Sequence, residues 1–189
     1  MICAMKGSDS VKNKRMTKKA GFSLIELIIV IAIMAIFVGI ATLSIGLIRS
    51  ADTRGLASAI NDSLTDLKSY TESHKGPYHM FIYKIDDSGF YSHFQEGEVF
   101  SYPESSPNEG DKRLGMATLR VDFVDGTDGS TKTIGDGSGT SKVYAKFRIQ
   151  KKDGSYLDAP KSLSVFKGST CDFKVLLTKD TGLHYVEQQ

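Results

Sequence analysis

Glu26 is the residue whose type and position most clearly call for a chemical explanation. It is the only charged residue between Lys19 and Arg49, and it lies four residues after Phe22. An acid at the centre of an apolar membrane helix costs about 2.5–3.5 kcal/mol to insert, and such acids usually have a partner and a function. A carboxylate that reaches water at the end of the apolar stretch is the alternative interpretation. The position of Glu26 therefore marks a candidate site.

Four aspartates near the middle of the chain could supply carboxylate oxygens to a calcium ion. They are Asp122, Asp125, Asp128 and Asp136. Their spacing does not fit the D-x-[DN]-x-[DN]-G pattern, and no glutamate follows at the twelfth position. An Asp-Gly-rich hairpin turn accounts for the same residues, so we expect no metal site.

The histidines and cysteines suggest no catalytic centre. The four histidines, which we expect to be exposed or half-buried, are His74, His79, His93 and His184. They lack ligand spacing, and the sequence contains no nucleophile elbow, phosphate loop or Cys-x-x-Cys pair. Cys171 is expected to be a buried strand residue, because cysteine behaves as a small hydrophobe. We expect a protein that is not an enzyme and that needs no cofactor.

A group of basic residues could in principle bind nucleic acid. It consists of Lys142, Lys146, Arg148, Lys151 and Lys152. These residues lie along the expected strand Lys142–Gln150 and directly after it, and a solvated strand face explains them without a ligand. Nucleic acid is therefore not an expected partner.

A long apolar run dominates the N-terminal part of the chain. It extends from Leu27 to Ile48 without a charge and is preceded by a basic tail. The bases of this tail are Lys6, Lys12, Lys14, Arg15, Lys18 and Lys19. A helix of this length crosses a bilayer core of about 30 Å. Positive charge before the run predicts that the N-terminus stays in the cytoplasm and the C-terminal part lies outside.

The junction before this run resembles a known signal. Residues 21–26 read Gly-Phe-Ser-Leu-Ile-Glu and lead directly into the apolar run. This sequence resembles the class III signal of type IV prepilins and secretion pseudopilins. The resemblance implies that a prepilin peptidase cleaves between Gly21 and Phe22 and that Phe22 is then N-methylated. It also matches Glu26 to the fifth residue of the mature chain.

The resemblance implies a role for Glu26 in assembly. In a filament its carboxylate would meet the N-terminal amine of a neighbouring subunit, because a buried carboxylate is costly unless it is paired. The implied partners are the peptidase, other pilin or pseudopilin subunits, the membrane, which is crossed once, and the assembly platform. The leader begins at Met1, Met5 or Met16.

The remainder of the chain predicts an α+β fold. Residues 49–76 continue the helix with one apolar face, on which Leu56, Ile60, Leu64, Leu67 and Thr71 are spaced, with Ala57 and Tyr70 beside them. The helix should end near Gly76 and Pro77 and pack on a mostly antiparallel sheet. The expected strands are Tyr78–Ile85, Phe90–Gln95, Met116–Val124, Lys142–Gln150, Ser162–Lys167, Cys171–Thr178 and Leu183–Glu187. Segments 102–114 and 125–142 are expected to be exposed, mobile loops.

Four segments follow: a leader at 1–21, a transmembrane and polymerisation helix at 22–48, an amphipathic helix at 49–76 and a β-rich head at 77–189. The expected function is that of a structural subunit, a minor pilin or a pseudopilin, of a type IV pilus or of a secretion or competence pseudopilus. Many short strands favour the H type of minor pseudopilin. A signal-anchored extracytoplasmic binding module that does not polymerise is the alternative. The choice among these filament systems, and between a major and a minor subunit, stays open.

Overall fold

The computed structural model describes residues 23–189, without the side chains of residues 40–50 and 140. The chain divides into two compact units, Met1–Thr42 and Leu43–Gln189. The described residues form an α+β fold with the long helix α1 (Leu24–Ser73), the short 3-10 helix η1 (Gly139–Ser141) and two antiparallel sheets. Within the described part of the chain, no helix qualifies as a membrane-spanning segment by length and apolar character. The side chains of residues 40–48, which belong to the predicted span, lie outside the described residues.

The part of α1 in the second unit buries one face, as the spacing of its apolar residues predicts. The buried side chains are Thr53, Leu56, Ala57, Ile60, Ser63, Leu64, Leu67 and Thr71. They recur every three or four residues, which places them on one stripe of the helix. The helix ends at Ser73, just before Gly76 and Pro77. Tyr70 does not share the buried face, because it is 41% exposed and stacks on Tyr78 instead.

Ten strands follow the helix and form two sheets of five strands each. The first sheet has the order β3 (Lys112–Gly115), β2 (Gly89–Glu96), β1 (Tyr78–Ile85), β6 (Ala145–Ile149), β7 (Tyr156–Asp158). The second has the order β10 (Leu183–Gln188), β9 (Thr170–Thr178), β8 (Ser162–Lys167), β4 (Arg120–Val124), β5 (Thr131–Thr133). The single sheet predicted from the sequence is therefore wrong, because the strands divide between two layers.

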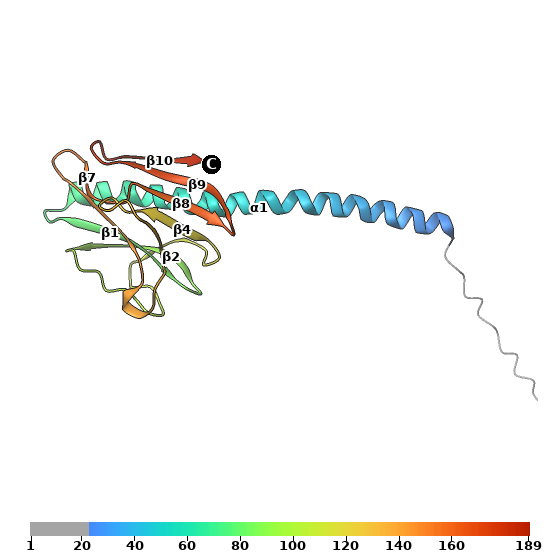
Figure 1. The fold of residues 1–189 in the computed structure, drawn as a ribbon, viewed down its shortest axis with the longest axis horizontal. Coiled ribbons are helices and arrows are strands. Elements are labelled where there is room, and N and C mark those ends of the chain that lie inside the picture. Colours follow the sequence, from blue (N-terminus) through green and yellow to red (C-terminus); the bar gives the residue numbers. More distant parts are fainter. Residues whose placement is uncertain (1–22) are drawn as a thin grey trace, which may run out of the picture. The chain divides into compact units, whose positions relative to one another are not determined.

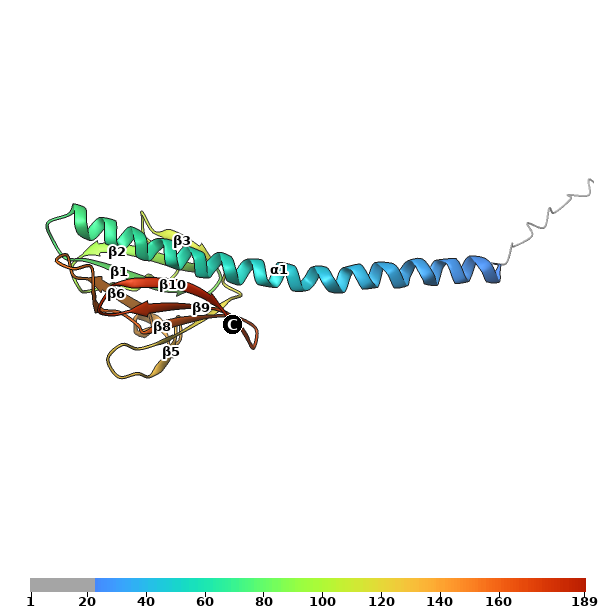
Figure 2. The ribbon, with the colours of Figure 1, turned by 90° about the horizontal axis from the view of Figure 1, so that it is seen from above.

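The main core lies between the two sheets and the buried stripe of α1. Figures 1 and 2 show both sheets gathered around the C-terminal part of α1. The core joins Leu64 of α1 to Met80 and Phe147 of the first sheet and to Val165 of the second. Gly115 allows α1 to come this close, because a Cβ there would lie 2.9 Å from Cδ1 of Leu56. The helix and both sheets thus contribute to one main core.

A second, aromatic cluster lies on the other face of the first sheet. Along β1 the side chains alternate, so that Met80 faces the main core while Phe81 and Tyr83 face away from it. Residues 97–111, which join β2 to β3 and which we call the strap, cover this outer face. Phe100 of the strap stacks on Phe81 with ring centroids 4.7 Å apart, and Tyr102 also belongs to the cluster. The strap therefore covers aromatic surface that water would otherwise contact.

The two segments predicted to be exposed loops are in part buried, which corrects that expectation. Segment 102–114 buries Tyr102 and Leu114 and contributes to β3, and segment 125–142 buries Ile134 and contains β5 and η1. Cys171 of β9 is half-buried rather than buried. The tip of the strap, residues 104–110, is exposed as expected.

Candidate functional site

The predicted processing site lies at the edge of the described chain. Gly21 and Phe22 are outside the described residues, and Glu26 lies in the first turn of α1. The backbone N–H of Glu26 donates to Oγ of Ser23 at 3.3 Å and to the carbonyl of Ser23 at 3.0 Å. Ser23 therefore caps the helix, with an acid three residues later, which is the spacing of a capping box.

Glu26 is exposed, and an acid in the first turn interacts favourably with the positive end of the helix dipole. The position of Glu26 thus has a local role at the start of the helix. This role leaves the carboxylate accessible to a charge from outside the chain. Sequence reasoning did not identify Ser23 as the cap, although the Ser-x-x-Glu spacing would have indicated it.

The helix surface around Glu26 is apolar on every side. All large apolar side chains from Leu24 to Val38 are between 47% and 77% exposed, so no face of this stretch is buried within its own unit. A helix that is apolar all round is stable only when other apolar groups surround it, either lipid or neighbouring helices. This stretch therefore presents an anchoring and packing surface with one carboxylate at its start.

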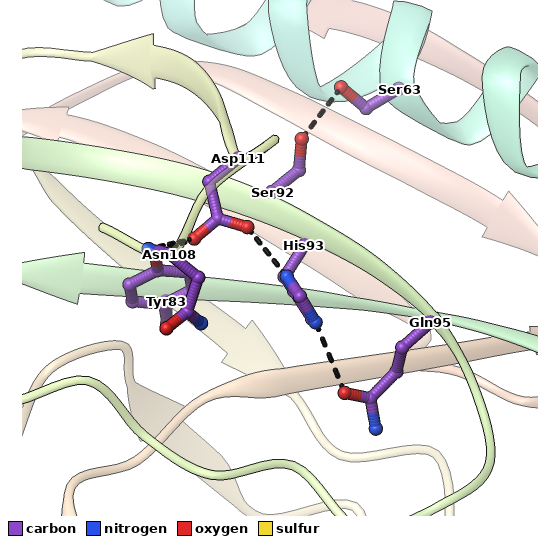
Figure 3. Close-up of polar contacts among 7 residues, drawn as sticks. All are labelled: Ser63, Tyr83, Ser92, His93, Gln95, Asn108 and Asp111. Carbon is purple, nitrogen blue, oxygen red and sulfur yellow. Dashed lines mark hydrogen bonds and ion pairs between the residues drawn. The ribbon is translucent and has the colours of Figure 1, made fainter.

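A buried carboxylate organises the polar contacts of the head domain (Figure 3). Asp111, whose side chain is 0% exposed, closes the strap. Its Oδ1 lies 2.6 Å from Nδ1 of His93, and its Oδ2 accepts from the hydroxyl of Tyr83 and from the backbone N–H of Asn108 at 2.7 Å. Burial, and then the bond to Asp111, raise the pKa of Tyr83 well above its usual range, so Tyr83 remains a donor.

Gln95 contacts the second ring nitrogen of His93. Nε2 of Gln95 donates to the carbonyl of Val99 at 2.7 Å, which leaves its Oε1 facing Nε2 of His93 at 3.1 Å. His93 thus faces an acceptor at each ring nitrogen, Asp111 on one side and Gln95 on the other. Both ring nitrogens of His93 are therefore occupied by contacts within the head domain.

This cluster does not form a catalytic triad despite its serine, histidine and aspartate. Ser92 precedes His93 on β2, so the two side chains point to opposite faces of the sheet. Oγ of Ser92 lies 3.5 Å from Oγ of Ser63 on α1, on the side of the main core. Because Nε2 of His93 already contacts Gln95, the ring has no position from which to activate a nucleophile.

A second histidine joins three elements in the neutral form. The hydroxyl of Thr65 on α1 donates to the carbonyl of Asn61 at 3.2 Å, so it can accept from Nε2 of His184, also at 3.2 Å. Nδ1 of His184 then accepts from the hydroxyl of Tyr156, at 2.9 Å. Burial, and then the positive charge of Lys68, lower the pKa of His184 and keep the ring uncharged.

His79 departs from the expectation of exposed or half-buried histidines. It is 2% exposed on β1, and neither ring nitrogen has a hydrogen-bond partner in the described structure. Burial, and then the charges of Lys146 and Arg148, lower the pKa of His79. The neighbouring β6 brings these two cations close because Arg148 pairs with His79 across the ladder. Only the strand register reveals this environment.

The central aspartates bond to nearby residues of the chain. Asp125 accepts from the backbone of Thr127 at 2.8 Å and from Lys132 at 2.7 Å, and Asp128 accepts from the backbone of Ser130 at 2.8 Å. These are turn contacts of the kind expected from an Asp-Gly-rich hairpin. Among the residues the structure describes, no group of three or more His, Cys, Asp or Glu side chains could hold a metal ion.

Two of the five residues in the basic group, Lys142 and Lys146, are paired with acids. Lys142 contacts Asp86 at 2.6 Å, and Lys146 contacts Glu98 at 2.6 Å and Asp158 at 2.8 Å. The hydrogen bond to Asp86 raises the pKa of Lys142. These pairs neutralise part of the charge that the sequence alone places on this face.

The comparisons with known proteins identify one feature, at the N-terminal junction. A family model described as the prokaryotic N-terminal methylation motif matches residues 16–42. No curated protein and no solved structure matches the chain. The matched range contains Gly21, Phe22 and Glu26 and ends within the apolar run.

Proposed function

We propose that this chain, which carries the N-terminal signature of type IV pilins and pseudopilins, is a structural subunit that polymerises through its N-terminal helix. It would build a type IV pilus or a secretion or competence pseudopilus, as a minor pilin or a pseudopilin. The observation that carries the proposal is the methylation motif at residues 16–42, with Glu26 at the start of a helix that is apolar on every side.

Processing supplies the charge that Glu26 requires. A prepilin peptidase would hydrolyse the peptide bond between Gly21 and Phe22 and release a new amine on Phe22, which is then N-methylated and stays positively charged. In a bundle of apolar helices this amine would contact the carboxylate of Glu26 on a neighbouring subunit. Subunits out of register would leave both charges buried without a partner, which is costly. The pair would therefore define the register of assembly.

Before assembly, the chain would be anchored in the membrane. The run from Leu27 to Ile48 would cross the bilayer once, with the basic tail in the cytoplasm and the head domain outside. From there the assembly platform would move subunits into the filament. The N-terminal helix would then exchange lipid contacts for helix contacts, which the exposed side chains of residues 24–38 support.

The head domain would have no enzymatic activity within this proposal. The histidine and serine closest to a catalytic arrangement, His93 and Ser92, point to opposite faces of β2 and have other partners. The H-type pseudopilin remains a proposal for the subtype, supported by a head made mainly of short strands.

A signal-anchored binding module that does not polymerise is the second candidate function. Two hollows in the head, with volumes of about 400 Å³ and 360 Å³, favour it. In a plain anchor Glu26 would act only at the start of its own helix and would have no role in assembly, so assembly assays of Glu26 variants distinguish the two candidates.

The N-terminus of the protein isolated from cells tests the proposal directly. We expect the mature chain to begin at N-methylated Phe22. Gly21→Ala is expected to be processed, because alanine is nearly as small, whereas Gly21→Leu is expected to remain uncleaved. N-terminal sequencing and intact mass measure both outcomes. A mature chain that starts at another residue, or that lacks the apolar run, would overturn the proposal.

A further inference from the structure

Two hollows lie next to each other where the chain passes from the first sheet to the second. Both are lined by Gly126, Thr127, Asp158 at the end of β7, and Ala159 and Pro160 of the crossover that leads from β7 to β8. Their volumes of about 400 Å³ and 360 Å³ fall within the range of about 300–1,000 Å³ that is typical of ligand sites. Together they form a groove that the crossover separates into two parts.

Gly126 fixes the shape of this groove. A Cβ at this position would lie 2.2 Å from the carbonyl oxygen of Ala159, so only glycine allows the turn after β4 to lie this close to the crossover. A hydrogen bond also joins the crossover to the end of β4, because the backbone N–H of Lys161 donates to the carbonyl of Val124 at 2.8 Å. The walls of the groove are therefore backbone segments in fixed contact.

The two parts of the groove differ in charge. The first part contains Lys132, Lys142 and Lys146, each of which forms an ion pair with an acid. The second part contains Lys161 and Lys179, and within residues 23–189 neither ammonium group has a hydrogen bond or ion pair. The only acid that lines the second part, Asp158, already contacts Lys146 at 2.8 Å. The second part therefore carries positive charge that the described chain leaves unbalanced.

The second part also has an aliphatic wall. Leu157, Leu177 and Pro160 line it, and Leu157 is 46% exposed. Tyr156 is 2% exposed, and its hydroxyl contacts His184, so it offers little stacking surface. An aliphatic surface beside two cations fits a ligand that has an aliphatic group flanked by carboxylates.

We propose that this groove binds an extended peptide segment of a partner protein in which an aliphatic side chain is flanked by acidic residues. The aliphatic side chain lies against Leu157 and Leu177, and the carboxylates contact the ammonium groups of Lys161 and Lys179. Nucleic acid fits less well, because single strands are held largely by stacking on exposed aromatic rings. This inference concerns the head domain and does not depend on polymerisation.

Peptide binding to the full chain, purified in a mild non-ionic detergent, tests the proposal. The probe is a fluorescent peptide, acetyl-Glu-Glu-Leu-Glu-Glu-amide, measured by fluorescence anisotropy. Two comparison peptides replace the leucine by serine or all four glutamates by lysine. We expect binding of the first peptide only, and weaker binding at high salt because the contacting charges are exposed.

Variants of the groove define where the peptide binds. Combined charge reversal, Lys161→Glu with Lys179→Glu, is expected to lower affinity by roughly tenfold or more, since two exposed ion pairs are lost. Leu157→Ser is expected to weaken binding of the leucine peptide. Lys152→Glu is the matched control, because Lys152 is an exposed lysine in the turn between β6 and β7, outside the groove. Unchanged circular dichroism spectra verify that each variant is folded.

Three results would overturn the proposal. The first is no binding of the leucine peptide, and the second is equal binding of the serine peptide. The third is equal loss of affinity in Lys152→Glu, which would indicate attraction to general surface charge. A fourth result would also overturn it. If single-stranded DNA displaces the fluorescent peptide at a lower concentration than the unlabelled peptide does, the ligand of the groove is a nucleic acid rather than a peptide.

Discussion

Within α1, residues 24–38 and residues 53–71 contain similar aliphatic side chains but bury them differently. Ile31 in the first stretch is 59% exposed, whereas Leu64 in the second is 0% exposed. The first stretch is apolar on all sides, and the second carries polar residues opposite its buried stripe. Similar aliphatic side chains are thus exposed in one stretch of the helix and buried in the core in the other.

The difference separates folding from assembly. A side chain that is already buried contributes to the stability of the isolated chain, because unfolding exposes it to water. A side chain that stays exposed contributes nothing comparable until lipid or another subunit covers it. Substitutions in the two stretches should therefore affect different measurements, and the following predictions rest on that contrast.

The largest effect is expected at Glu26. Glu26→Val should leave cleavage at Gly21 intact and strongly reduce incorporation into filaments, because the amine of Phe22 on the next subunit loses its partner. An uncompensated buried charge costs about 3–5 kcal/mol. Membrane fractionation and sheared filaments measure where the variant accumulates.

Ser23→Ala is the matched control for this substitution. It removes the cap at 3.3 Å from the N–H of Glu26 but retains the carboxylate. Normal assembly of Ser23→Ala together with defective assembly of Glu26→Val supports charge pairing. Equal defects in both variants would instead point to the start of the helix as the important feature.

The second prediction compares the two stretches of α1 directly. Leu64→Ala should lower the free energy of unfolding of the head by about 2–5 kcal/mol, since it leaves a cavity in the core. Ile31→Ala should leave it unchanged. Urea unfolding of the full chain in detergent measures both. Similar losses in the two variants would refute the proposed division of roles.

A smaller effect is expected where the strap is attached. Asp111→Asn replaces one of the two carboxylate oxygens that contact Tyr83, His93 and the backbone of Asn108 by an amide group, and it should destabilise the head by about 1–3 kcal/mol. Amide hydrogen exchange within residues 97–111 should accelerate. Glu109→Gln, an exposed strap residue, serves as the control. Unchanged protection of the strap in Asp111→Asn would show that aromatic packing alone holds it.

The smallest expected effect is a pH dependence from His79 and His184. Their pKa values are lowered from 6.5, mainly by burial, so the unfolded chain binds protons before the folded chain does. The contribution of these two histidines to stability should therefore be fully present above about pH 6.5, and it should be lost as the pH falls below that value. The pKa values of Asp86 and Glu98 are lowered mainly by their hydrogen bonds to Lys142 and Lys146. Their contribution to stability is therefore lost only at lower pH, below the ordinary carboxyl values of 3.8 and 4.5.

This prediction is measured by the unfolding midpoint as a function of pH, between the ordinary carboxyl value of 4.5 and the ordinary histidine value of 6.5. The slope should be shallower in a His79→Phe, His184→Gln double variant than in the unsubstituted chain. Comparing slopes rather than midpoints cancels any general loss of stability caused by the substitutions. Identical slopes would mean that these two histidines do not titrate on unfolding in this range.

The sequence predicted the elements that have a strong local pattern. Strands Tyr78–Ile85 and Ser162–Lys167 agree residue by residue, and the buried stripe of α1 follows its 3.6-residue period. Strands β3, β5 and β7 were missed because they contain three or four residues each, too few to show alternation. The predicted strand from Met116 begins only at Arg120, after a turn in which Leu119 donates to the carbonyl of Met116 at 3.3 Å.

The contacts that organise the head depend on long-range register. Asp111 and His93 lie on separate segments, and only the pairing of β2 with β3 brings them together. The sequence also did not predict that both faces of β1 are buried, because its outer face is covered by a loop rather than by another sheet. By contrast, the N-terminal junction is a contiguous motif, so residues 16–42 were recognisable from sequence alone.

The strap has a practical consequence for engineering the head. It is attached at one end by the Glu98–Lys146 ion pair and at the other by Asp111, while residues 104–110 between them are exposed. Lengthening a flexible loop is inexpensive, at about 0.6 kcal/mol for each doubling of its length. A tag or epitope inserted between Ser105 and Ser106 would therefore be displayed on the surface without disturbing either core.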